Sequence, residues 1–199
     1  ALLMLTVALM TSWSLAQNKI VFVTSSPVPS PRNWPFPGGT AGGDILCNTA
    51  ANAVPLDTTN GTYRAWLATS AAKDPESTFT QASVPYVLTN GTQVTDDWAD
   101  LTDAFLDNQI VINENGVTVE SVGVWTGTSE LGGLNVEPDC LDWTSSDALQ
   151  FGAIGVSDNT TVGQWSVFTN VNCNQHSINH LYCFQQGPVP VELLQFTVE

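Results

Sequence analysis

The fold is indicated most clearly by VWTGTSELGGLNVEPDCLDWTSSD at residues 124–147 and by CNQHSINHLYCFQQ at residues 173–186. These segments contain three of the four cysteines, and the fourth, Cys47, lies far upstream in a stretch with helical character. An even number of cysteines in an exported chain is typical of disulfide bonding. We therefore expect the C-terminal half to fold back on the N-terminal half and to be joined to it covalently.

The composition indicates a β-rich domain with many loops. The 199 residues include 15 Gly, 11 Pro, 7 Trp and 8 Phe. This proportion of turn formers and large aromatic anchors suits a β-rich domain, whereas a helical bundle would contain more Leu, Glu and Lys. The length is sufficient for one domain of about 150–170 residues with a substantial core and short extensions.

The charge balance excludes several classes of partner. There are 19 acidic and 4 basic residues, the formal net charge is −15, and no Lys or Arg follows Lys73. Nucleic-acid binding needs clustered cations, so that partner is excluded, and heparin-like polyanions and anionic membrane surfaces are disfavoured for the same reason. Calcium ions and neutral ligands such as sugars are compatible with the negative charge of the chain. The alternative is that the acidity only keeps the protein soluble.

Both ends of the chain read as extensions of the domain. Residues 1–16 are an apolar run typical of the end of a signal peptide, and an uncleaved anchor is the alternative. The domain is then expected at 17–186, and 187–199 reads as a linker or extended tail. This tail resembles linkers that precede surface-sorting modules. We therefore expect membrane attachment only through an anchor or sorting module outside this chain.

These features predict a secreted, extracellular or cell-surface protein. Glycosylation sequons fit surface loops in such a protein, provided that its source glycosylates exported chains. They occur at Asn60, Asn90 and Asn159.

Short strands separated by turns are predicted along most of the chain. From β-branched runs, alternation and turn residues we expect strands at 19–25, 62–69, 86–88, 92–94, 109–113, 117–119, 122–126, 141–144, 151–156, 165–169 and 181–185. One helix is predicted at 41–54. A second is predicted from Trp98, Leu101 and Phe105 on one face, with Thr95 or Asp96 as its cap.

Six blocks in order carry a family resemblance: GGDILCNTAANAV (42–54), GTYRAWLATS (61–70), DDWADL (96–101), VWTGT (124–128), CLDWTSS (140–146) and HLYCFQQ (180–186). Together they resemble the endostatin branch of the C-type-lectin-like superfamily. They are more closely similar to a family of bacterial secreted domains of unassigned function. The resemblance covers residues 20–186.

The resemblance implies an α+β, C-type-lectin-like fold. In this fold two short helices flank a twisted antiparallel sheet with a long loop region. The resemblance also implies nested disulfides, Cys47–Cys183 and Cys140–Cys173, where the cysteine positions alone leave three pairings open. Trp125 and Trp143 would then be core residues beside the bridges. Endostatin-type domains use arginine patches for heparin and N-terminal histidines for zinc. This chain has neither, so these sites are not expected here.

The loop before and after Cys140 is a candidate calcium site. Calcium takes roughly six to eight oxygen ligands, and carboxylates are supplied here by Glu137, Asp139 and Asp142, with Asn135 and Asp147 nearby. Calcium-dependent C-type lectins carry Glu-Pro-Asn in their long loop and Trp-Asn-Asp later. Here the first triplet ends in Asp139 and the later one reads Trp143-Thr144-Ser145. The alternative is a solvated acidic loop without a metal.

Other constellations are interpreted as structural, and no catalysis is expected. His176 and His180 are too few for a zinc site, and we expect them in structural or surface roles. The aspartates Asp96, Asp97, Asp100 and Asp103 fit a helix cap and a solvent face better than a glycosidase pair. Tryptophans that could stack on sugar rings are Trp34, Trp66 and Trp165, although most of the tryptophans are expected in the core.

Two classes of function stay open. The first is a secreted recognition module for a glycan or an extracellular protein, acting in carbohydrate binding or adhesion. The second is a structural, display or self-assembling extracellular domain without a small ligand.

Overall fold

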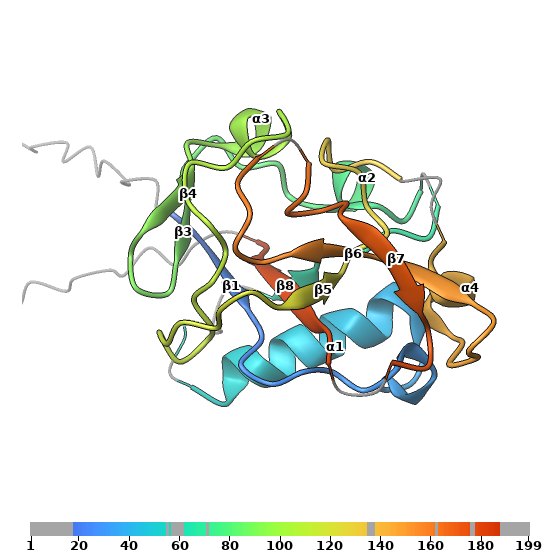
Figure 1. The fold of residues 1–199 in the computed structure, drawn as a ribbon. Helices are drawn as coiled ribbons and strands as arrows, with labels where there is room; N and C mark the ends of the chain where they lie inside the picture. Colours follow the sequence, from blue (N-terminus) through green and yellow to red (C-terminus); the bar gives the residue numbers. More distant parts are fainter. Residues whose placement is uncertain are drawn as a thin grey trace, which may run out of the picture.

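The chain folds as an α+β domain built on one sheet (Figure 1). The computed structural model describes residues 18–54, 56, 62–70, 72–134, 138–161, 163–175 and 178–187. Over these residues the strands are β1 (Lys19–Val23), β2 (Tyr63–Ala65), β3 (Tyr86–Leu88), β4 (Gln93–Thr95), β5 (Gly123–Trp125), β6 (Phe151–Val156), β7 (Thr169–Asn172) and β8 (His180–Gln185). The helical elements are η1 (Pro31–Asn33), α1 (Gly39–Asn52), α2 (Pro75–Thr78), α3 (Trp98–Leu101) and α4 (Cys140–Trp143).

Some sequence expectations concern positions outside the described residues. These are the signal peptide at 1–16, the tail beyond Gly187, the sequon residue Asn60, the calcium candidate Glu137 and His176.

Strand β8 is the centre of the sheet. The strand order is β4-β3-β1-β8-β5-β6-β7, and β2 also pairs with β8. The sheet is mixed and not antiparallel as the resemblance implied, because β1 runs parallel to β3 and β5 runs parallel to β8. All six residues of β8 are buried because both faces of the strand are covered. Successive side chains point to opposite faces, so Leu181 and Cys183 enter one hydrophobic cluster while Tyr182 and Phe184 enter another. The last described strand therefore separates two cores.

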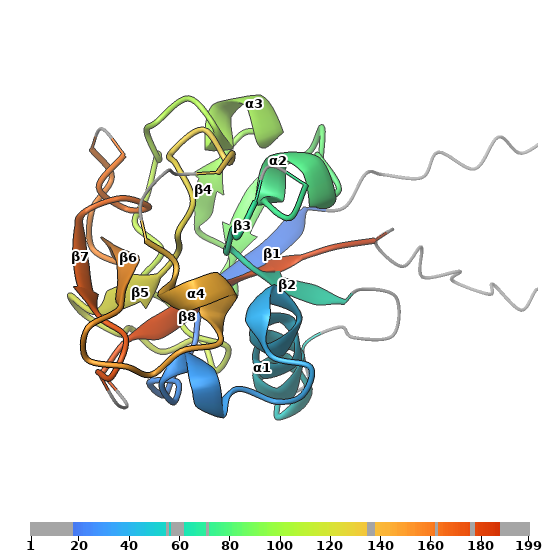
Figure 2. The same cartoon turned by 90° about the vertical axis from the view of Figure 1, so that its right-hand side faces the viewer.

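The first core lies between the sheet and α1 (Figure 2). It contains Trp125 and Trp143, both fully buried, with ring centroids 5.6 Å apart in an edge-on arrangement. Trp34 stacks on Trp143 at 5.8 Å. The expectation that Trp125 and Trp143 are core residues is confirmed, and Trp34, only 5% exposed, is not a surface platform.

The second core is centred on Trp66, which is fully buried. Its ring centroid lies 5.1 Å from those of both Trp165 and Phe184 and 5.7 Å from that of Phe79. The indole Nε1 of Trp66 donates to the Ser166 hydroxyl at 2.9 Å. Trp66 and Trp165 therefore contribute to packing and are not available to stack on a ligand.

Two disulfides join distant parts of the fold. Cys47–Cys183 links α1 to β8 across 136 residues, and Cys140–Cys173 closes a loop of 33 residues. These are the pairs that the family resemblance implies. In the chain-entropy model they stabilise the fold by about 5 and about 4 kcal/mol. Two disulfides indicate an oxidising or extracellular compartment. Within the described part of the chain, no helix is long and apolar enough to cross a membrane.

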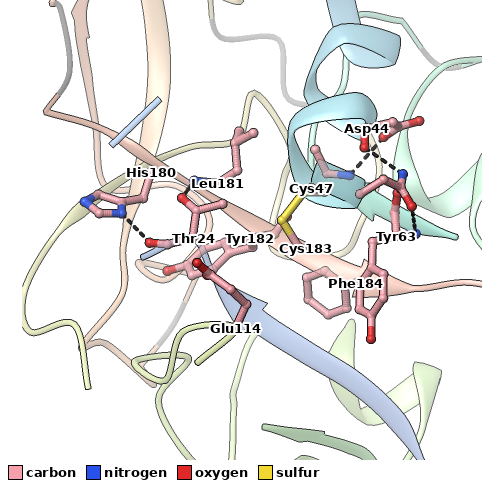
Figure 3. The surroundings of a disulfide bond; sticks show 12 residues. Thr24, Asp44, Cys47, Tyr63, Glu114, His180, Leu181, Tyr182, Cys183 and Phe184 are labelled. Carbon is pink, nitrogen blue, oxygen red and sulfur yellow. Dashed lines mark hydrogen bonds between the residues drawn. A yellow bond between two sulfur atoms is a disulfide. The ribbon is translucent and has the colours of Figure 1, made fainter. Parts of the chain in front are cut away.

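Helix α1 also covers the outer edge of β2 (Figure 3). The Asn48 side chain accepts from the Tyr63 amide at 2.8 Å and donates to the Tyr63 carbonyl at 2.7 Å. The Asp44 carboxylate accepts from the Ala65 amide at 2.9 Å. Because these residues are spaced i, i+4, both face the strand and take the place of a neighbouring strand.

Several strands form where the sequence predicts them. The hairpin of β3 and β4 turns at Asn90 and Gly91, and β6 has the predicted limits. The segments 109–113 and 117–119 do form a turn, but neither is a strand, and they contribute only isolated bridges, from Ile112 to Thr118 and from Asn113 to Val23.

Three further predicted elements are wrong. The helix predicted to reach Phe105 stops at Leu101, because Ala104 has a φ of 83°, and Phe105 is 52% exposed. Its cap is Asp97, in place of Thr95 or Asp96. The strand predicted at 165–169 begins only at Thr169, since a turn stabilised by the bond from the Val167 amide to the Gly163 carbonyl precedes it. The strand predicted at 141–144 is the turn α4.

Candidate ligand-binding site

The turn α4 has an unusual backbone. Its four residues, Cys140, Leu141, Asp142 and Trp143, have φ values of 56°, 54°, 57° and 55°. This left-handed conformation costs non-glycine residues roughly 1–2 kcal/mol each. The apolar–polar alternation of Leu141, Asp142 and Trp143 imitates a strand in the sequence. The bonds that favour the turn come from residues outside it.

Three sets of contacts hold α4 in this conformation. The Asp139 carbonyl accepts from the Trp143 amide at 2.7 Å, and the Trp143 indole donates to the Ala68 carbonyl at 2.9 Å. The third contact is the disulfide from Cys140 to Cys173. With Cys140 and Trp143 buried, Leu141 is left 58% exposed. Strained backbone that is over-determined by its surroundings is common at binding sites.

An open hollow lies beside this turn, which we call the α4 hollow. Its volume is about 380 Å³ and it is lined by Arg32, Leu141, Thr144, Ser145, Ser146 and Asp147. The lining consists of a guanidinium group, a carboxylate, three hydroxyls and one aliphatic side chain. Arg32 comes from η1, whereas the other residues come from α4 and the segment after it.

The segment after α4 is fixed by local hydrogen bonds. The Asp147 carboxylate accepts from the Leu149 amide at 2.8 Å, and the Asp147 amide donates to the Ser145 hydroxyl at 3.1 Å. The Cys173 amide donates to the Gln150 carbonyl at 2.9 Å. The polar wall of the α4 hollow is therefore held to β7 and to the second disulfide. Because its residues are already fixed, they lose little conformational freedom when a ligand binds.

The α4 hollow suits a neutral ligand with several hydroxyl groups. The hydroxyls of Ser145 and Ser146 can both donate and accept, whereas that of Thr144 already donates to the Leu141 carbonyl and can only accept. Arg32 only donates, and an ionised Asp147 only accepts. One positive and one negative group leave the hollow without net charge. The exposed side chain of Leu141 offers an apolar contact for the non-polar face of a ring.

The structure places two of the three calcium candidates in one turn. The Asp139 carboxylate accepts from the Asp142 amide at 3.1 Å, so it caps α4. Burial raises the pKa of the Asp139 carboxyl, and the neighbouring Asp142 adds to the shift. Asp142 is exposed. Among the described residues no group of three or more His, Cys, Asp or Glu is placed to hold a metal ion.

The histidine and aspartate candidates make local structural contacts. The Nδ1 atom of buried His180 lies 2.6 Å from the Thr24 carbonyl oxygen. Asp97 accepts from the Asp100 amide at 3.0 Å, and Asp100 accepts from the Asp96 amide at 2.7 Å. Burial raises the pKa of the Asp100 carboxyl, with further contributions from nearby aspartates.

Both described sequons lie at turns. Asn90 is exposed, and its side-chain oxygen accepts from the Thr92 amide at 3.0 Å. The Asn159 side-chain oxygen accepts from the Thr161 amide at 2.8 Å. Both positions fit the surface loops that sequons need.

Five of the residues that line the α4 hollow were not singled out as candidates in the sequence: Arg32, Leu141, Thr144, Ser145 and Ser146. Arg32 offered a signal, because it is one of only 4 basic residues in the chain. The hydroxyl residues 144–146 gave little indication of a site in the sequence, since Thr-Ser-Ser is common in loops.

The chain matches no protein-family model and shows no significant similarity to a curated protein. Its function can therefore be inferred only from the fold and from the chemistry of its surfaces.

Proposed function

We propose that this protein is an extracellular recognition module of the C-type-lectin-like class, with a carbohydrate as its ligand and the α4 hollow as its binding site. The observation that carries the proposal is the set of three hydroxyls, one guanidinium and one carboxylate that converge on this hollow. Sugars are recognised by hydrogen bonds of this kind together with an apolar contact on the ring face.

Three features support the class and the compartment. The two disulfides are nested as the family resemblance implies, and Cys47–Cys183 ties α1 to β8, the last described strand. The net charge of −15 suits an exported protein and argues against anionic glycans. The binding groups lie on irregular segments that a rigid scaffold positions, which is the usual arrangement of recognition sites.

The test is a glycan array of neutral and sulfated sugars probed with the full chain, followed by calorimetry on the best ligand. We expect saturable binding to a neutral glycan. We expect at least tenfold weaker binding in Asp147→Asn, where the amide still accepts the Leu149 bond but the charge is lost. The matched control is Asp107→Asn, an exposed aspartate outside the hollow with the same charge change. The site is rejected if both variants lose affinity equally, or if no glycan binds.

Calcium at Glu137, Asp139 and Asp142 is an extension of the same proposal. Calorimetric titration with calcium and thermal unfolding in calcium and in chelator test it. Binding that disappears in Asp142→Asn, together with a higher Tm in calcium, would support a metal in the loop. If adding calcium produced no heat and no shift in Tm, calcium binding at this loop would be rejected. The carbohydrate proposal would then stand without a metal.

A self-assembling domain is the second candidate, favoured by one observation. Strand β7 ends the described sheet order, and its residues Thr169–Asn172 carry no charge. The nearby Phe168 is 55% exposed, and Phe151 on the adjacent β6 is 44% exposed. Light scattering over a concentration series would detect assembly through this edge, and Thr169→Lys, at an exposed position of β7, would abolish it. A monomer at every concentration would argue against this candidate.

A further inference from the structure

The turn α4 lies beside Gly39, at the start of α1, and a second hollow lies at the C-terminal half of the same helix. We call it the 24–29 groove. It has a volume of about 250 Å³ and is lined by residues 24–29, by Leu46, Thr49, Ala50 and Ala53 of the C-terminal half of α1, and by Glu114. Its walls are mainly apolar, and Glu114 is the one charged residue among those that line it.

The wall formed by residues 24–29 is rigid. The Thr24 amide donates to the Leu181 carbonyl at 3.0 Å, and the Val28 amide donates to the Asn179 carbonyl at 2.8 Å. Because a carbonyl oxygen can only accept, the Nδ1 atom of His180 donates to the Thr24 carbonyl, as Figure 3 shows. Pro27 and Pro29 add fixed φ angles. The groove is therefore formed before any partner arrives.

Glu114 is a buried carboxylate without a described counter-ion. It is 7% exposed, and the single ion pair among the described residues joins Arg64 to Asp44, elsewhere in the fold. His180 does not compensate it at neutral pH, because burial lowers the pKa of that imidazole despite the opposing effect of Glu114. A buried charge is costly unless it is paired or fully hydrogen-bonded.

Among the described residues, the hydrogen bonds of Glu114 leave room for one more donor. Oε2 accepts from the Ser25 amide at 2.8 Å, and Oε1 accepts from the Ser25 hydroxyl and from the Asn115 side-chain amide. A carboxylate has about four acceptor positions, two on each oxygen. The remaining position is on Oε2. A single free position suits an ammonium group, whereas a guanidinium prefers both oxygens at once.

We propose that the 24–29 groove docks a lysine side chain of a protein partner. The aliphatic stem would lie along the apolar wall, and the ammonium would donate to Oε2 of Glu114. The volume is below the roughly 300–1,000 Å³ of pockets for drug-sized ligands, so it fits one side chain better than a free ligand. The net charge of −15 attracts a basic partner over longer distances.

The probes are three capped peptides that differ at one position, with lysine, acetyl-lysine or arginine between two leucines. Binding to the full chain is followed by NMR through the amide signal of Ser25. We expect saturable binding of the lysine peptide, at least tenfold weaker binding of the acetyl-lysine peptide, and weaker binding of the arginine peptide. Equal affinity for the lysine and acetyl-lysine peptides, or no binding of the lysine peptide, would overturn the proposal.

A blocking variant tests the location without disturbing Glu114. Ala53→Lys places a lysine at the exposed end of α1 in the groove, where it competes with the peptide. Asn52→Lys is the matched control, because this exposed neighbour carries the same added charge but does not line the groove. We expect loss of peptide binding only in Ala53→Lys, with both variants retaining the wild-type Tm and glycan binding. Equal effects of the two variants would overturn the proposal.

Discussion

The regions around the two disulfides differ in regularity. Around Cys47–Cys183, α1 packs on β8 and β2, and its own side chains complete the edge of the sheet. Around Cys140–Cys173, the backbone forms a left-handed turn, and Leu141 and Leu149 are 58% and 81% exposed. The first region is built for stability. The second uses a covalent link to hold irregular segments with exposed side chains, and it is here that we propose the binding site.

The largest expected effect separates the two disulfides. Replacing Cys47 and Cys183 by alanine should lower the free energy of unfolding by about 5 kcal/mol, because that bridge closes a loop of 136 residues. Replacing Cys140 and Cys173 should lower the free energy of unfolding by about 4 kcal/mol. It should also remove the covalent link that holds the residues lining the α4 hollow in place. Denaturant unfolding measures both changes. A larger loss from the second pair would reverse the ranking of the two regions.

Gly155→Ala tests how tightly the sheet packs near the irregular region. A Cβ atom here would lie 1.8 Å from the Trp165 carbonyl oxygen, so the backbone of β6 or of the turn at Trp165 must move. We expect a loss of more than about 3 kcal/mol, measured as a fall in Tm. Gly133→Ala is the control, because its Cβ would meet only the end of the Glu76 side chain and should cost under about 1 kcal/mol. Similar losses in both would show that β6 can adjust.

Asn48→Ala tests the side-chain edge that α1 gives to β2. It removes the acceptor for the Tyr63 amide and the donor to the Tyr63 carbonyl, and we expect a loss of about 2 kcal/mol. Hydrogen exchange should show faster exchange of the Tyr63 amide than in the wild type. Asn52→Ala, at an exposed position of the same helix, should stay within about 0.5 kcal/mol. Unchanged protection of Tyr63 would mean that another group takes over this edge.

Asp44 adds a smaller, pH-dependent effect in the regular region. Burial raises the pKa of its carboxyl from 3.8 to about 6, although Arg64 lies 3.3 Å away and opposes the shift. Between these values the folded state binds more protons than the unfolded state, so the contribution of Asp44 to stability falls as the pH rises from about 4 to about 7. The difference should be on the order of 2 kcal/mol, reduced because a quarter of the side chain is exposed.

Denaturant unfolding across this pH range measures the effect, and Asp44→Asn should remove it. Asp107→Asn, at an exposed position, should leave the pH dependence unchanged. A wild-type curve that matches Asp44→Asn at every pH would show that the Arg64 ion pair cancels the cost of burial.

Local patterns predicted the regular region well. The helix predicted at 41–54 is α1 at 39–52, because its apolar residues and the proline that follows are local signals. The hairpin at Asn90-Gly91 and the strand β6 were also predicted correctly, because their signals are local in the sequence. Prediction failed at 141–144, since a disulfide and the bond from the Trp143 indole to Ala68 override the local alternation.

The candidate sites were harder to predict than the fold. Asp139, Asp142 and Asp147 were singled out as acidic residues near Cys140, and two of them now cap or line the region of the α4 hollow. Arg32 reaches this hollow from more than 100 residues away, and Glu114 meets residues 24–29 in the same way. Contacts between segments so far apart form only when the chain folds back on itself, and no local sequence pattern predicts them.

The sequence by itself determined the acidic character of the chain and predicted a β-rich domain whose cysteines pair. These properties follow from composition and from short-range patterns, whereas the α+β class and the disulfide pairing were implied by the family resemblance. The tertiary structure alone decided which tryptophans are buried, that α4 is left-handed, and that one hollow lies beside α4 and another at the C-terminal half of α1. The physical reason is that burial, strain and the pairing of charges depend on atoms brought together from distant parts of the chain.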